Sequence, residues 1–164
     1  MNALRILKHW FIGSIPISQI LSAKNLNAIC NSISEAEITT SAEIRFIAER
    51  ALPTSYLLRN APANERAKML FSKYRCWDTE DNNGVLLYIC PADHAIEILL
   101  DRAAARVISQ KQLSEIIQSI SLSFLAQDFE GGIILAIKRI ASLLAPHFPS
   151  KNEENPLPNE AVLL

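Results

Sequence analysis

The sequence lacks both the cysteine content of a disulfide-bonded protein and the ligand spacings of a zinc protein. Its 164 residues include three cysteines, which are widely spaced and lie within apolar runs: Cys30, Cys76 and Cys90. An odd number of such cysteines indicates reduced thiols buried in a core. No Cys-x-x-Cys or His-x-x-x-His spacing occurs, so nothing supports a zinc site. The three histidines are scattered, and we expect each to be a solvated side chain.

An excess of charge and a long apolar run are also absent. Lys and Arg number 16 against 17 Asp and Glu, and no basic stripe is interleaved with aromatic residues, so nucleic acid is not an expected partner. A membrane span needs about 20 apolar residues. Since the sequence holds no such run, we expect no transmembrane segment and a cytoplasmic location. The chain has the length of roughly one domain.

Residues 1–14 form a short amphipathic segment in which Arg5, Lys8 and His9 interrupt apolar residues. A secretory signal would need an unbroken apolar core of about 7 to 15 residues, which this segment lacks. Two interpretations stay open. The segment can dock on the core of the protein itself, which is the favoured interpretation, or it can lie on a membrane surface as a peripheral basic amphipathic helix.

Apolar periodicity predicts an α/β protein whose main domain covers residues 15–149. Spacings of three to five predict a helix from Ser18 to Glu37, and alternation predicts a half-buried strand at 43–49. Further elements follow as a helix at 60–74, strands at 84–90 and 95–101 joined by a turn, and helices at 103–108, 109–124 and 128–144. Residues 150–164 are polar and proline-containing, which predicts a disordered tail.

The direction of the strands brings acidic residues together. A strand, a crossover helix and a second strand form a parallel unit in nearly all proteins, while a tight turn can only make an antiparallel hairpin. The amino ends of the first two strands and the carboxyl end of the third therefore share one edge of a small mixed sheet. Four carboxylates reach this edge: Glu43, Asp78, Asp81 and Asp101.

Convergent carboxylates predict a divalent-cation site, with Ca²⁺ or Mg²⁺ as the ion, because hard cations favour oxygen ligands. The alternative is that the run at 77–84, Trp-Asp-Thr-Glu-Asp-Asn-Asn-Gly, is an ordinary solvated loop. This segment does not have the ligand spacing of an EF-hand.

The sequence resembles the TPM domain family. The resemblance is carried by Ala42-Glu43-Ile44-Arg45-Phe46, by Trp77-Asp78-Thr79-Glu80-Asp81-Asn82-Asn83-Gly84-Val85-Leu86-Leu87-Tyr88, and by Glu97-Ile98-Leu99-Leu100-Asp101-Arg102. It implies a three-layer α/β/α sandwich around a small mixed sheet with a central β-hairpin. Relatives include a thylakoid-lumen acid phosphatase, a photosystem II repair factor and a nematode modulator of acetylcholine receptors, and some bind calcium.

The chain departs from that family at two glycines, because Ala42 and Ala103 stand where many bacterial relatives have glycine. The resemblance and the acidic edge together favour a cation-binding, regulatory module. One alternative is a metal-assisted acid phosphatase acting on phosphomonoesters. A second is a membrane-proximal scaffold that contacts a protein partner or a membrane through residues 1–14.

Overall fold

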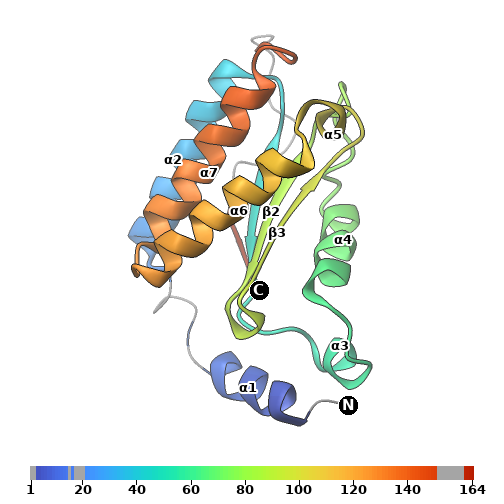
Figure 1. Cartoon of the computed structure of the whole chain (residues 1–164), viewed down its shortest axis with the longest axis vertical. Coiled ribbons are helices and arrows are strands. Elements are labelled where there is room, and N and C mark those ends of the chain that lie inside the picture. The colour runs from blue at the N-terminus through green and yellow to red at the C-terminus, as the bar shows by residue number, and fades with distance from the viewer. Residues whose placement is uncertain (1–2, 15, 17–20, 151–160) are drawn as a thin grey trace.

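The computed structural model describes residues 3–14, 16, 21–150 and 161–164 and confirms the predicted α/β class. Helices cover both faces of a mixed sheet, with α2, α6 and α7 on one side and α3 and α4 towards the other (Figure 1). The elements in chain order are α1 (Ala3–Gly13), α2 (Ala23–Thr39), β1 (Ile44–Ala48), α3 (Thr54–Leu58), α4 (Ala63–Lys73), β2 (Val85–Cys90), the 3₁₀ turn η2 (Pro91–Asp93), β3 (Ala95–Leu100), α5 (Ala104–Val107), α6 (Gln110–Leu125), α7 (Phe129–Leu144) and β4 (Val162–Leu163).

The sheet has the predicted strand directions. Its order is β3-β2-β1-β4, with β1 parallel to β2 and β3 antiparallel to β2. In the register, Ile44 pairs with Val85, and Val85 pairs with Leu100. The residue before each of the first two strands and the residue after β3 therefore lie side by side at one edge, as the crossover and hairpin rules require.

The prediction of a disordered tail over 150–164 is wrong for its last residues. Val162 and Leu163 form β4, which pairs in parallel with Ile47 and Ala48 of β1. The Leu164 amide also donates to the Ala48 carbonyl at 2.9 Å. A short apolar stretch gives little signal by itself, and its partner lies more than a hundred residues away in the chain. Residues 151–160 lie outside the described residues.

Two apolar clusters hold the layers together. Residues such as Phe46 and Leu87 pack with α2, α6 and α7, while Ile47, Leu86 and Tyr88 pack with the α3–α4 side. β1 is buried along its whole length and is not half-buried as predicted, because helices cover both faces and β4 lies along its side. Two polar residues, Arg45 and Glu49, are consequently buried as well.

The helix boundaries follow the predicted caps in part. The Ser109–Gln112 capping box is present at α6, and the Asp128 side chain accepts from the Gly131 amide at the start of α7. The predicted cap Ser18 lies outside the described residues, and α2 begins at Ala23 behind a capping box formed by Ser22 and Asn25. Thr54–Leu58 forms α3, which periodicity did not reveal because a helix this short shows little more than one turn.

Candidate functional site

Two of the four predicted carboxylates, Glu43 and Asp101, meet at one edge of the sheet. The Val85 amide donates to the Glu43 carbonyl at 2.8 Å, and the Asp101 amide donates to the Gly84 carbonyl at 2.8 Å. These bonds extend the sheet by one step beyond the ends of its strands. Glu43 and Asp101 thus flank Gly84 at the edge beside α5, which lies at the top of Figure 1.

Glu43 and Asp101 are buried at this edge, with 8% and 7% of their surfaces exposed. In each carboxylate one oxygen, Glu43 Oε2 or Asp101 Oδ2, is buried and has no hydrogen-bond partner, and Asn83 Oδ1 is a third such acceptor. The other oxygen of Asp101 accepts from the Arg102 amide at 2.7 Å. A buried acceptor without a donor costs about 1 to 3 kcal/mol, more for a charged group. A bound cation would stabilise these three oxygens, which have no hydrogen-bond donor.

The other two predicted carboxylates lie further out. Asp81 accepts from Ser41 Oγ at 3.0 Å, and Ser41 Oγ in turn accepts from the Asn83 side-chain Nδ2 at 3.2 Å. The Asp78 side chain is 53% exposed and faces Arg75 at 3.8 Å. Among the described residues, no three carboxylate, imidazole or thiol groups lie close enough together to enclose a metal ion. The sequence therefore predicted the shared edge, but the full ligand set that it predicted is not assembled in this structure.

The substitutions at the family glycines fit this backbone. Ala103 has φ −79° and ψ −42°, an ordinary helical conformation, and its amide donates to the Asn82 carbonyl at 2.9 Å. Ala42 is fully buried, and its amide donates to Thr40 Oγ1 at 3.1 Å. The left-handed conformation that would favour glycine is not required at Ala103.

Negative charge exceeds positive charge around Glu43. Burial is the largest cause that raises the pKa of Glu43, the charges of Glu37 and Asp78 add to it, and Arg45 offsets part of the increase, so that the net value is about 7. Glu37 itself is held at the edge, because its Oε1 accepts from the Ile44 amide at 3.2 Å. The ionised form of Glu43 is therefore electrostatically unfavourable, and a bound cation would stabilise it.

We expect the pKa of Glu43 to appear in the pH dependence of stability. Its ordinary value is 4.5 and its value in the fold is about 7, so the folded chain binds more protons than the unfolded chain between these two values. Stability should fall as pH rises through this window, by about 2 kcal/mol after allowance for solvent screening. Urea unfolding in EDTA at about pH 5 and about pH 8 measures this loss. In Glu43→Gln the loss of stability between these two pH values should be smaller by the same amount. A pH profile identical to that of the parent would contradict the assignment of this loss to Glu43.

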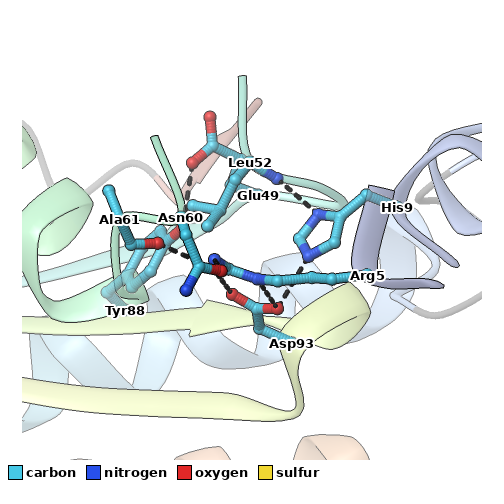
Figure 2. A network of polar contacts seen from close by, with 8 residues as sticks. All are labelled: Arg5, His9, Glu49, Leu52, Asn60, Ala61, Tyr88 and Asp93. Atoms are coloured by element: carbon cyan, nitrogen blue, oxygen red, sulfur yellow. Dashed lines mark hydrogen bonds and ion pairs between the residues drawn. The ribbon is translucent and has the colours of Figure 1, made fainter. Parts of the chain in front are cut away.

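A second polar cluster lies at the opposite end of the sheet and was not predicted. Asp93, at the end of η2, receives two hydrogen bonds from the Arg5 guanidinium, Nε to Oδ1 at 3.0 Å and Nη2 to Oδ2 at 2.6 Å (Figure 2). His9 Nε2 contacts Asp93 Oδ1 at 2.7 Å. The expectation that His9 is solvated is wrong, since its exposed fraction is 2%. Arg5 and His9 stand four apart and share one helix face, a spacing that could have pointed to a common partner.

Asp93 ties α1 to the rest of the protein. The Leu52 amide donates to His9 Nδ1 at 3.0 Å, so Nε2 carries the proton that is donated to Asp93. Arg5 also donates to the Ala61 carbonyl at 2.7 Å. Beside these bonds, Ile6 and Ile12 pack against the cluster on the α3–α4 side. The first interpretation of residues 1–14, docking on the protein's own core, is the one that the structure supports.

Asp93→Asn should loosen α1 without unfolding the sheet. Burial alone would raise the pKa of Asp93, but the hydrogen bonds from Arg5 and His9 together lower it below its ordinary value. The ionised carboxylate thus contributes stability that is present above the ordinary pKa and is lost as pH falls through the lowered one. Hydrogen bonds to a charged group contribute about 1.5 to 3 kcal/mol each. In Asp93→Asn we expect the α1 amides to exchange hydrogen faster than in the parent protein, while exchange in β2 stays the same. Equal exchange of the α1 amides in the variant and in the parent would contradict this role of Asp93.

A third buried group lies next to the second cluster. Glu49, which follows β1, accepts from Arg66 Nε at 2.8 Å and Nη2 at 2.5 Å, and from the Tyr88 hydroxyl at 2.9 Å. Only 4% of Glu49 is exposed. This cluster fastens α4 to β1 and β2. All of its hydrogen bonds are internal, so we assign it a structural role.

Comparison with known proteins identifies a family and a similar solved structure. The sequence matches the TPM domain family over residues 17–143. The chain belongs to the TPM domain family. No functionally curated protein matches it. A similar solved structure is the NMR structure of the BA42 protein from the psychrophilic bacterium Bizionia argentinensis, with a TM-score of 0.77 and 28% sequence identity over 88% of this chain and 95% of that chain.

The TPM assignment confirms the predicted family and, with the observed layers, the predicted sandwich architecture. The match begins after α1 and ends before β4, so both of these elements lie wholly outside the matched region. Within the described residues, no helix is both long and apolar enough to cross a membrane.

Proposed function

We propose that this TPM domain binds a divalent cation, Ca²⁺ or Mg²⁺, at the edge formed by β1, β2 and β3. The observation that carries the proposal is the pair of buried carboxylates, Glu43 and Asp101, each with an oxygen that has no hydrogen-bond partner. A buried charge is stabilised by pairing or by metal coordination, and the ion pair that Asp101 makes is a long one, to the exposed Arg102 at 3.9 Å. Asn83 Oδ1 supplies a neutral oxygen of the type that Ca²⁺ also accepts.

The outer carboxylates would complete the site. Asp81 is held towards it through Ser41, and Asp78 is close enough to Glu43 to raise the pKa of that group. Ca²⁺ takes six to eight oxygens in flexible geometry and includes water among them, whereas Mg²⁺ demands a near-ideal octahedron. A site with two buried carboxylates and two acids on a loop favours the more tolerant ion, so Ca²⁺ is the preferred ion of the two.

Thermal unfolding with added CaCl₂, with MgCl₂ and with EDTA tests the proposal. An ion present at about 100 times its dissociation constant stabilises the native state by about 2.7 kcal/mol, which for a chain of this size raises Tm by about 5 to 10 °C. Glu43→Gln and Asp101→Asn should abolish the increase. Glu35→Gln is the control, since Glu35 is an exposed carboxylate on α2, paired with Lys138 at 3.7 Å. Equal Tm values in all three solutions would refute cation binding.

One observation favours hydrolysis as a second candidate function. A general base works best when its pKa lies near the operating pH, and the pKa of Glu43 is raised to about 7. In a metal-assisted phosphatase the cation would be held by Asp101 and the outer acids and would activate water, while Glu43 would accept the proton of that water without ligating the cation. Turnover of p-nitrophenyl phosphate that requires both added cation and Glu43 would support this candidate. Cation binding without turnover would leave the domain a binding module.

A further inference from the structure

Helix α1 has two faces with opposite surroundings. Arg5, His9 and Ile12 face the protein, while the other side carries four large apolar side chains that are mostly exposed: Leu4 (77%), Leu7 (59%), Trp10 (77%) and Phe11 (73%). At 3.6 residues per turn these four positions span an arc of about 120°. They form one outward apolar face, which is called the α1 face below.

The α1 face lies at one end of the molecule and has an apolar neighbour. α1 lies across the tip beyond the β2–β3 hairpin, far from the acidic edge (Figure 1). α3 contacts α1 and also carries an exposed leucine, Leu58 (58%). Single exposed apolar residues are ordinary, but a contiguous group that includes two aromatic rings indicates a binding surface.

The charge of the N-terminal stretch suits an anionic surface. No Asp or Glu precedes Glu35 in the sequence, whereas Arg5, Lys8 and Lys24 lie in that stretch. The charge of Arg5 is offset by Asp93, so Lys8 supplies the positive charge at the margin of the face. Aromatic rings flanked by lysine are the composition that places an amphipathic helix at the headgroup level of a bilayer.

The size of the face argues against a second copy of the chain. Its four side chains expose roughly 500 to 600 Å², below the approximately 800 Å² that each partner buries in a stable protein complex. A lipid surface requires no such minimum, because each apolar side chain inserts independently. The face is also convex, since it is one side of a single helix at the end of the molecule.

We propose that α1 binds the surface of an anionic membrane through Leu4, Leu7, Trp10 and Phe11, while Arg5 and His9 remain bound to Asp93. The inward contacts hold the helix in place, so the domain is carried to the membrane without unfolding α1. The acidic edge lies at the other end of the sheet and would then point away from the lipid. This inference does not depend on cation binding.

Vesicle flotation of the full chain tests the proposal, with vesicles of phosphatidylcholine alone or with one quarter phosphatidylglycerol. We expect binding to the anionic vesicles, and a loss of at least about 100-fold in W10S/F11S. Lys8→Gln should weaken binding to anionic vesicles about five-fold. The matched control is I38S/L125S, which removes two equally exposed apolar side chains (74% and 80%) from α2 and α6 and should bind normally.

Fluorescence and mass measurements separate the lipid from other occupants. In a Trp77→Phe background Trp10 is the single tryptophan, and its emission should shift to the blue on anionic vesicles. Absence of vesicle binding, or binding that W10S/F11S does not reduce, would overturn the proposal. A dimer in light scattering that W10S/F11S converts to monomer would likewise overturn it in favour of a second copy.

Discussion

Gly84→Ala should cost the protein at least about 3 kcal/mol and abolish cation binding at the acidic edge. A Cβ at this position would lie 1.8 Å from the Cys76 carbonyl oxygen and 3.0 Å from its carbon. Both atoms belong to the backbone, so no side chain can rotate away, and either β2 or the 76–83 loop must move. That loop carries Asp78 and Asp81. Urea unfolding and the calcium-dependent change in Tm measure the two effects.

Gly13→Ala is the matched control for this substitution. Gly13 is the last residue of α1, and a Cβ there would meet the Ala51 Cβ at 3.4 Å, an ordinary contact. None of the glycines among the described residues has a positive φ, so backbone strain does not separate the two positions. Gly13→Ala should be neutral or slightly stabilising. If Gly84→Ala unfolds at the same urea concentration as the parent, the close contact between the loop and β2 is not a constraint on the fold.

Glu49→Gln should destabilise the protein by about 3 kcal/mol. The substitution removes the charge that Arg66 faces from 2.5 Å and weakens the acceptor of the Tyr88 hydroxyl, both at a site with little access to water. Removing one partner of a buried ion pair leaves the charge of the other partner, here Arg66, buried and uncompensated. This costs far more stability than the loss of an exposed pair. The midpoint of urea unfolding should fall with an unchanged m-value.

Glu65→Gln isolates the contribution of burial. Glu65 and Arg59 also lie 2.5 Å apart, but their side chains are 46% and 51% exposed. Water and salt screen such a pair, and we expect no measurable change in stability. Comparable losses in Glu49→Gln and Glu65→Gln would show that distance, and not burial, determines what these ion pairs contribute.

The sequence predicted those features that depend on short-range pattern and chain direction. The alternation around Phe46 and the apolar run from Val85 to Cys90 located two strands. The crossover rule then places Glu43 and Asp101 at one edge without reference to any distance. Caps such as Ser109 and Asp128 also follow local rules, because the side chain bonds an amide three residues away.

The features that the sequence did not reveal depend on contacts between distant segments. Asp93 binds Arg5 and His9 across more than eighty residues, and no local pattern relates a turn residue to an N-terminal helix. The orientation of Asp78 is likewise a property of its loop, in which Arg75 adopts a positive φ of 52° and faces the carboxylate from outside the edge. Spacing alone could place these acids near the edge but could not orient their side chains.

The C-terminal strand has a consequence for how the protein behaves among other copies of itself. Val162 and Leu163 satisfy backbone donors and acceptors of β1 that would otherwise have no partner in the sheet. A chain shortened before Ala161 would leave these amide and carbonyl groups of β1 open to strands of neighbouring molecules, a common origin of aggregation. Val162 and Leu163 therefore prevent strands of other molecules from extending the sheet at β1.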